Sequence, residues 1–173
     1  MVRSTGTSTE MTPTIKMLVL DVDGVMTDGG MYYTETGDQF KKFDTKDGMG
    51  IRLAMQQGME VAFLSSGTNA RIISDRAATL GVQRVHAGWG EKLEVLNRWC
   101  TESGIALHEV AYIGDDVNDL GCIRAVGLSA CPADAVEAVR HAVTHILTRN
   151  GGAGCVREFI DAYLLQGHST APL

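Results

Sequence analysis

Short apolar runs alternate with helical patterns along most of this chain, and that alternation limits the folds open to it. Residues 15–20 (IKMLVL) and 110–113 (VAYI) are almost unbroken apolar runs, as expected of strands that are buried on both faces. Helical patterns at residues 70–80 and 91–103 each end at a glycine. Strands that are joined by helices form a parallel sheet covered on both faces. The sequence therefore predicts an α/β fold with a Rossmann-like, doubly wound parallel sheet.

One segment breaks the alternation. Residues 29–43 place aromatic side chains on both sides of the turn ETGD, which is typical of a β-hairpin. The other strands are expected at residues 15–20, 61–64, 110–113, 128–130 and 145–147 and around Val85, and the helices at residues 49–57, 70–80, 91–103, 119–125, 133–141 and 156–165. We expect one domain over residues 15–168, preceded by a flexible, Ser/Thr-rich tail at residues 1–14.

The charge of the chain narrows its range of partners. Its net charge is -6 and its sequence pI is about 5.3, and an acidic surface argues against nucleic acid or an anionic membrane as a partner. No apolar run approaches the roughly 20 residues that span a membrane, and residues 1–14 lack the apolar segment of a signal peptide. The four cysteines have no metal-binding spacing and fit buried thiols in a reducing cytoplasm. We expect a cytoplasmic protein that binds neither nucleic acid nor membranes.

Two acidic motifs follow two of the expected strands. Residues 21–24 (DVDG) come directly after the first strand, and residues 114–119 (GDDVND) follow the strand at residues 110–113. The carboxyl ends of parallel strands meet at one edge of the sheet, so these carboxylates should lie close together. Their mutual repulsion calls for a cation, and hard oxygen ligands with few histidines favour magnesium. The first motif alone fits a turn with helix-capping aspartates equally well, but the second motif after a buried strand weighs against that interpretation.

Two further features complete a candidate phosphate site. Ser66 and Gly67 follow the strand at residues 61–64 and precede a helix, where a hydroxyl and backbone N–H groups can receive phosphate oxygens. Lys92 begins a helix, where its positive charge interacts unfavourably with the helix dipole. A bound phosphoryl group would offset that unfavourable interaction. Taken singly, Ser-Gly before a helix is more often only a cap, and such a lysine is more often a solvated surface residue. In combination with the acidic motifs, they favour phosphate chemistry.

The order of these motifs resembles that of the haloacid dehalogenase superfamily. Residues 21–24, Ser66-Gly67, Lys92 and residues 114–119 look like the four motifs of that superfamily, and the resemblance covers residues 15–166. Within the superfamily, the chain is similar to the 3-deoxy-D-manno-octulosonate 8-phosphate phosphatases and their relatives that act on nine-carbon acids, in the stretches LVLDVDGVMTDGGMYY, FDTKDGMGIRLA, DRAATLGV, VAYIGDDVNDL and GGAGCVREFID. The resemblance implies a magnesium-dependent phosphatase of lipopolysaccharide biosynthesis that hydrolyses a phosphorylated sugar acid through an aspartyl-phosphate.

The resemblance also implies a catalytic role for each motif. Asp21 attacks phosphorus. Asp23 protonates the departing sugar oxygen and then activates the water that hydrolyses the aspartyl-phosphate. Ser66, Gly67 and Lys92 hold the phosphoryl oxygens. These roles suit the residue types, because a carboxylate nucleophile divides the reaction into two steps and one positioned carboxyl can serve as acid and then as base.

By the same resemblance, magnesium is held by Asp21, by Asp23 through its backbone carbonyl, and by Asp115, while Asp116 and Asp119 support the metal site. Phosphoryl transfer depends mainly on in-line positioning and on the neutralisation of charge. A cation among these carboxylates would provide that neutralisation.

The substrate contacts of the family lie in the segment after the hairpin and on the helices nearby. The residues implied here are Asp44, Thr45, Lys46, Asp47, Gly48, Arg52 and Arg76. Arg52 and Arg76 could bind a substrate carboxylate as bidentate forks, although each is equally well a surface arginine. The chain departs from the family at Thr68, where an arginine usually follows the glycine of the second motif. That departure leaves the phosphate chemistry intact and the identity of the sugar acid open.

The hairpin takes up much of the stretch between Asp23 and Ser66, so we expect a hairpin flap and no large cap domain over the site. The resemblance implies a homotetramer in which a neighbouring hairpin closes each site, and the apolar residues Met31, Tyr32 and Tyr33 are consistent with such an interface. Three alternatives stay open: a phosphatase of a nine-carbon, sialic-acid-like 9-phosphate, a capless phosphatase of macromolecules, and a non-catalytic domain associated with a sugar-acid cytidylyltransferase.

Overall fold

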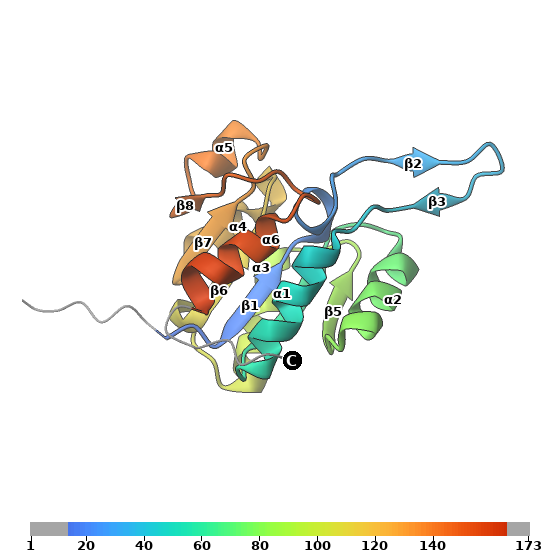
Figure 1. Ribbon diagram of the computed structural model, residues 1–173. Coiled ribbons are helices and arrows are strands. Elements are labelled where there is room, and N and C mark those ends of the chain that lie inside the picture. Colours follow the sequence, from blue (N-terminus) through green and yellow to red (C-terminus); the bar gives the residue numbers. More distant parts are fainter. Residues whose placement is uncertain (1–13, 166–173) are drawn as a thin grey trace, which may run out of the picture.

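A computed structural model describes residues 14–165; the expected tail, apart from Thr14, and the last three residues of the expected domain lie outside them. Six strands form one parallel sheet in the order β5-β4-β1-β6-β7-β8 (Figure 1). They are β1 (Met17–Leu20), β4 (Glu60–Ser65), β5 (Arg84–Ala87), β6 (Val110–Ile113), β7 (Leu128–Cys131) and β8 (His145–Ile146). The predicted doubly wound parallel sheet is confirmed, with the first strand at its centre.

Helices cover both faces of the sheet. The first face carries α1 (Thr45–Gln56), α2 (Ala70–Leu80) and α6 (Cys155–Phe159), and the second carries α3 (Lys92–Ser103), α4 (Leu120–Ala125) and α5 (Glu137–Arg140). The side chains of β1 alternate between these faces, since Leu18 and Leu20 join the first core and Met17 and Val19 the second. Within the described residues, no helix is both long and apolar enough to cross a membrane.

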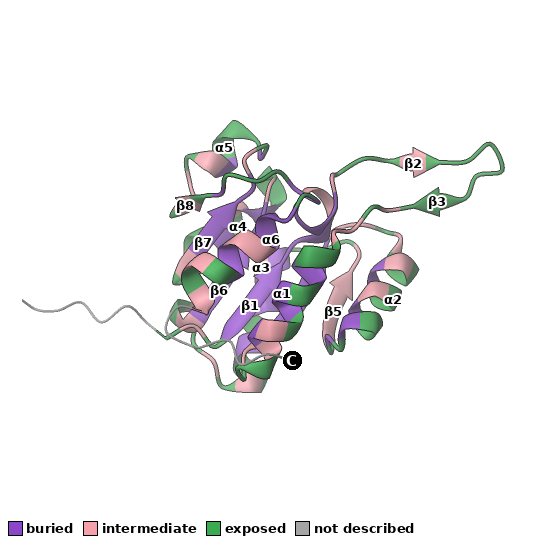
Figure 2. Cartoon of the chain, in the orientation of Figure 1, coloured by how far each residue is buried: buried purple, intermediate pink, exposed green. Residues whose placement is uncertain are grey.

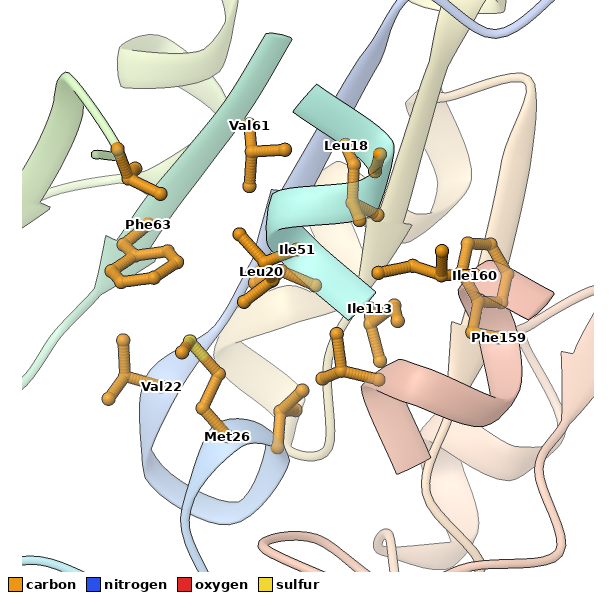
Figure 3. Close-up of a cluster of buried hydrophobic side chains, with 14 of the residues drawn as sticks. Leu18, Leu20, Val22, Met26, Ile51, Val61, Phe63, Ile113, Phe159 and Ile160 are labelled. Atoms are coloured by element: carbon orange, nitrogen blue, oxygen red, sulfur yellow. The ribbon is translucent and has the colours of Figure 1, made fainter. Parts of the chain in front are cut away.

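The first core packs α1 and α6 against the sheet near its carboxyl edge. Ile51 of α1 and Phe159 of α6 lie over Leu20 and Ile113 and are fully buried (Figures 2 and 3). Burying one such side chain typically contributes about 1.5–3 kcal/mol, so this layer holds α1 and α6 firmly on the sheet.

The predicted hairpin is confirmed at β2 (Tyr32–Tyr33) and β3 (Gln39–Phe40), which pair antiparallel and stand away from the body (Figure 1). The rings of Tyr32 and Phe40 stack across the two strands with their centroids 5.0 Å apart. Met31, Tyr33 and Phe40 are 66%, 57% and 53% exposed, whereas Tyr32 is half-buried. The hairpin is therefore largely exposed (Figure 2), and three of its exposed side chains are large and apolar.

Two helices differ from the prediction. The helix expected at residues 49–57 begins four residues earlier, because the side chain of Asp44 accepts a hydrogen bond from Lys46 N at 2.7 Å and caps it. The helix expected at residues 133–141 is helical only at Glu137–Arg140, so the prediction for residues 133–136 was wrong. There the backbone makes other bonds: Ala133 N donates to Arg149 O and Val136 N donates to Asp115 O, each at 3.0 Å.

Candidate active site

The two acidic motifs meet at the carboxyl edge of the sheet, as predicted. Asp21 follows β1, and its backbone N–H donates to Ile113 O of β6 at 3.0 Å. Gly24 turns the chain away with φ +87, and a Cβ atom at that position would lie 2.0 Å from Asp115 Oδ2. Glycine is therefore needed twice over at position 24, for the turn and for the approach of the Asp115 carboxylate.

Lys92 lies between two carboxylates beneath this edge. Its Nζ atom donates to Asp21 Oδ1 and to Asp119 Oδ1, both at 2.7 Å. All three residues are buried, with exposed fractions of 3% for Lys92, 5% for Asp21 and 0% for Asp119. The first residue of α3 is thus drawn inward by opposite charges, which is why a lysine is stable at that end of a helix. The surface interpretation of Lys92 is excluded.

The carboxylate of Asp119 orients the second acidic motif by accepting hydrogen bonds from it. Its Oδ1 accepts from Tyr112 Oη at 2.6 Å, in addition to Lys92, and its Oδ2 accepts from the backbone N–H groups of Asp115 at 3.0 Å and Asp116 at 3.3 Å. Both oxygens are thereby occupied by donors, so Asp119 orients its neighbours rather than offering a free lone pair. The side chain of Asp116 is exposed and caps the turn by accepting from Val117 N.

The crowding of carboxylates changes their acidity. Burial, followed by the charge of Asp119, raises the pKa of Asp21 well above its ordinary value, while Lys92 acts in the opposite direction. Burial likewise raises the pKa of Asp115 to about 6. Burial acts to lower the pKa of Lys92, but the two adjacent carboxylates outweigh it and the pKa is raised. The raised pKa values mean that Asp21 and Asp115 ionise less readily than free carboxyl groups do, and a bound cation would favour their ionised forms.

The residues present fit a magnesium ion. Asp21, Asp115 and Asp119 each bring a carboxylate oxygen to a common point, with these atoms within 4.8 Å of one another. Oδ1 of Asp115 is buried and has no hydrogen-bond partner among the described residues, which suits a metal ligand. An all-oxygen donor set of this kind favours magnesium. Because Asp119 is bonded to donors on both oxygens, we assign it a supporting role beside Asp21 and Asp115.

A cavity of about 220 Å³ opens over these carboxylates. It is lined by Asp21, Asp23, Ser65, Ser66, Gly67, Asp115, Asp116, Val117 and Asn118. Ser66 and Gly67, which were expected to receive a phosphate, both line this cavity: Ser66 Oγ accepts from Asn118 Nδ2 at 3.1 Å, and Gly67 N donates to Ser65 Oγ at 2.9 Å. Residues from three neighbouring strand ends thus converge on one small polar cavity, as ligand sites of such sheets do.

Asp23 has a partner that the sequence did not indicate. Its Oδ1 accepts from Nζ of Lys41, which follows β3 of the hairpin. On its other side, a Cβ atom at Gly67 would lie 2.7 Å from Asp23 Oδ2. The only available signal for Lys41 was a cation at the base of the hairpin, and nothing in the sequence indicates which way that side chain turns. Tyr112 was also missed, although a tyrosine hydroxyl in a buried strand requires a partner.

The expected substrate contacts are not brought together with this cavity. Asp44 caps α1, and Asp47 is buried and accepts from Arg157 N at 2.8 Å. A second cavity, of about 150 Å³, is lined by Thr45, Gly48, Met49, Arg52, Arg76 and Leu80. Lys46 lines a third, of about 360 Å³, with Arg149 and Arg157. No residue among the described ones lines more than one of these three cavities.

Arg52 and Arg76 nevertheless form a cationic pair. Their charges lie close enough that Arg52, after burial, lowers the pKa of Arg76. Arg52 donates to Thr79 O at 2.8 Å, Arg76 donates to Asp44 O at 3.4 Å, and Nε of Arg76 is buried without a partner among the described residues. The guanidinium of Arg76 lies over the ring of Phe43, 5.4 Å from its centroid. Because these two guanidinium groups donate to neutral carbonyl oxygens, their positive charges are available to bind an anion.

Comparison with known proteins places the chain among phosphatases. The profile of the haloacid dehalogenase-like hydrolases matches residues 84–160. The 3-deoxy-D-manno-octulosonate 8-phosphate phosphatase of Haemophilus influenzae is 40% identical over 157 residues, which is 90% of this chain and 87% of that protein. The enzyme of the same name from Escherichia coli K12 is 39% identical over 151 residues, or 87% of this chain and 80% of that protein.

A solved structure agrees with the sequence relatives. It is a 3-deoxy-D-manno-octulosonate 8-phosphate phosphatase from Moraxella catarrhalis, described in complex with a magnesium ion, a phosphate ion and a KDO molecule. It superposes with a TM-score of 0.82 at 34% identity and covers 85% of this chain and 84% of that one. With the strand-end carboxylates, the buried lysine and the phosphate cavity in place, the chain belongs to the 3-deoxy-D-manno-octulosonate 8-phosphate phosphatase family of haloacid dehalogenase-like hydrolases.

Proposed function

We propose that this protein is a magnesium-dependent phosphatase that hydrolyses 3-deoxy-D-manno-octulosonate 8-phosphate. The observation that carries the proposal is the buried contact of Lys92 with Asp21, at the floor of a cavity that Asp115 and Ser66 also line. The named relatives act on this sugar-acid phosphate, and the chain matches them over most of its length. We further propose that the chain works in the cytoplasm and supplies this sugar acid for lipopolysaccharide biosynthesis.

In the first step, Asp21 forms a bond to phosphorus while the bond from phosphorus to the sugar oxygen breaks. Asp23 supplies the proton that the departing oxygen takes up, since its carboxyl lines the same cavity. Lys92 and Ser66, with the backbone at Gly67, hold the phosphoryl oxygens. Magnesium, when bound by Asp21, Asp115 and the backbone carbonyl of Asp23, neutralises charge on the phosphoryl group.

In the second step, Asp23 removes a proton from water, the water oxygen bonds to phosphorus, and Asp21 departs with its electron pair. Lys92 then faces a restored carboxylate at 2.7 Å, as in the resting structure. The buried ammonium group stabilises the leaving carboxylate, so it favours hydrolysis of the acyl phosphate. No redox change occurs, and the proton balance closes because Asp23 gives one proton and takes one back.

The carboxylate of the substrate is bound by the Arg52 and Arg76 pair, with Asp44, Thr45, Lys46, Asp47 and Gly48 shaping the surrounding segment. Gly48 gives Arg76 its room, since a Cβ atom there would lie 2.5 Å from Arg76 Nη2. The pair lines a cavity separate from the phosphate cavity of the same chain. In a homotetramer, the exposed hairpin of a neighbouring subunit would complete each site. Phosphate binding and carboxylate binding would then be combined across the interface between subunits.

Kinetics on matched phosphate esters test the function. We expect 3-deoxy-D-manno-octulosonate 8-phosphate to give a kcat/KM about tenfold to a hundredfold above that of glucose 6-phosphate, because a bidentate contact to a charged group contributes about 1.5–3 kcal/mol. Replacing Arg52 and Arg76 with methionine should remove that advantage and leave glucose 6-phosphate unaffected. Equal efficiency of the wild-type enzyme on both esters would refute the substrate assignment, and a higher kcat/KM on the nine-carbon 9-phosphate would move it to the longer acid.

A further inference from the structure

The Asp23 carboxylate is held between two segments that are distant in sequence. Lys41 donates to its Oδ1 from the hairpin, and Gly67 lies against its Oδ2 from the loop after β4. The side chain of Lys41 is 11% exposed and that of Asp23 is 35% exposed, so the contact is largely shielded from solvent on the lysine side. One oxygen is thereby occupied by the ammonium group, while the carboxyl still lines the phosphate cavity.

Lys41 itself is held in place from both sides. Before it, Gln39 of β3 accepts from Asn69 Nδ2 at 3.3 Å, at the start of α2. After it, Phe43 pairs with Thr27 in an isolated antiparallel bridge. A lysine side chain loses considerable conformational freedom when it is fixed. The fixed backbone here reduces the number of positions in which its ammonium group can lie, and the contact with Asp23 selects one of them.

We infer that Lys41 is a positioning residue for Asp23 in the hydrolysis of the aspartyl-phosphate. The inference rests on the proposed function and concerns its second step. In that step Asp23 Oδ2 takes a proton from water, the water oxygen bonds to phosphorus, and the bond from phosphorus to Asp21 breaks. A carboxylate whose other oxygen is fixed by Lys41 presents one oxygen in one orientation to that water. Displacement of a catalytic group by about 1 Å can cost on the order of a hundredfold in rate.

The neighbouring lysine provides a matched control. Lys42 lies on the same arm of the hairpin, and its Nζ donates to the backbone oxygen of Gly152 at 3.3 Å. Lys41→Met and Lys42→Met remove the same charge from adjacent positions, but only the first removes the contact with Asp23. Lys41→Arg retains a cation at the first position and should recover part of what methionine loses.

The test uses the full chain, magnesium and p-nitrophenyl phosphate, whose leaving group departs without a proton. For this ester kcat/KM reports the transfer to Asp21, and kcat reports hydrolysis once that step is slow. Lys41→Met should lower kcat about tenfold to a hundredfold and lower KM in parallel, with a burst of p-nitrophenolate close to one per site. Lys42→Met should change neither constant by more than about twofold.

A variant that is merely damaged would behave differently. If Lys41→Met lowers kcat and kcat/KM together with no burst, or changes nothing, or if Lys42→Met produces the same split, the positioning role is wrong. Failure of the proposed function would look different again, since a wild-type enzyme that forms no phosphorylated intermediate would contradict the covalent mechanism before any variant is compared.

Discussion

At the scale of single residues, one ammonium group governs the site. Lys92 lies 2.7 Å from oxygens of both Asp21 and Asp119, and its side chain is almost inaccessible. Without it, two buried carboxylates would repel each other, and breaking a buried pair of this kind typically costs about 3–5 kcal/mol. The same charge lies beside Asp21, the proposed nucleophile. In the proposed mechanism, stability and catalysis would therefore depend on Lys92 for the same electrostatic reason.

The nucleophile can be tested by an isosteric change. Asp21→Asn should retain the fold and lose at least about ten-thousandfold in kcat, because an amide cannot form the phosphorylated intermediate. Since burial raises the pKa of Asp21, a neutral side chain at that position should not lower thermal stability measured without metal. Near-wild-type turnover by this variant, in steady-state assays of a good substrate, would contradict the covalent mechanism.

The metal site gives a second prediction at this scale. Magnesium at a hundred times its dissociation constant should raise the free energy of unfolding by about 2.7 kcal/mol, measured by chemical denaturation, and Asp115→Asn should lose most of that gain. Chelation should abolish activity and added magnesium restore it. Calcium should bind but support little turnover, because its looser coordination misplaces the reacting groups. Full activity in excess chelator would rule out the assignment.

The motif residues could be found from sequence because they stand directly after buried strands. Asp21 and Asp115 follow β1 and β6, and the geometry of a parallel sheet brings such positions to one edge. Lys41 could not be found that way, since its contact with Asp23 depends on how the hairpin leaves the sheet. Arg52 of α1 and Arg76 of α2 were expected at the carboxylate end of the substrate, and they line a cavity separate from the one at the sheet edge. The sequence could not place that cavity, because the pattern of a helix does not indicate its rotation relative to the sheet edge.

At the scale of elements, Asp47 joins α1 to the first turn of α6. Its carboxylate accepts from Arg157 N at 2.8 Å, and its other oxygen is buried without a partner among the described residues. Gly48 and Gly50 both look unfavourable in a helix, and Gly48 lies just before the start that the sequence predicted at residue 49. The structure shows why they are there: Cβ atoms at these positions would lie 2.5 Å from Arg76 and 2.9 Å from Arg157. Close packing outweighs helix propensity at both positions.

The contribution of Asp47, at the contact between α1 and α6, to the free energy of unfolding should depend on pH. Burial raises the pKa of Asp47 from 3.8 to about 6, so the folded protein holds that proton more tightly than the unfolded chain does. The resulting stabilisation is complete below pH 3.8 and is lost as the pH rises through about 6. Relative to wild type, Asp47→Asn should gain about 2.4 kcal/mol in unfolding free energy between pH 4 and pH 8. Urea unfolding at both pH values measures it, and a constant difference between the two proteins would contradict the prediction.

At the scale of the whole molecule, the hairpin is an element that the rest of the described chain leaves largely exposed to solvent. Met31, Tyr33 and Phe40 are exposed on this hairpin, which stands away from the body (Figure 1). Large apolar side chains that gather on one exposed element are consistent with an interface. The chain has no cap domain among its described residues, and in the proposed tetramer a neighbouring subunit would exclude water from the cavity beside Asp21.

Assembly is therefore a prediction that the hairpin can test. Light scattering at micromolar concentration should give the mass of a tetramer, and Tyr33→Glu should shift it to smaller species, since a buried charge disfavours the interface. The same variant should lose about tenfold or more in kcat/KM on the sugar-acid phosphate, if a neighbour completes the site. A monomeric wild-type enzyme with high activity on that substrate would refute closure by a neighbour.

The strand order has a consequence for how this molecule forms. β1 is the first strand in the chain, but its two neighbours are β4 at Glu60–Ser65 and β6 at Val110–Ile113. During synthesis it remains unpaired on one side until residue 113 has emerged, and pairings between such distant segments close slowly. Until then an apolar strand is exposed to other chains. Folding yield should thus depend on what shields residues 17–20 while the ribosome makes the next hundred or so residues, and a chaperone that binds extended apolar segments would have its longest opportunity there.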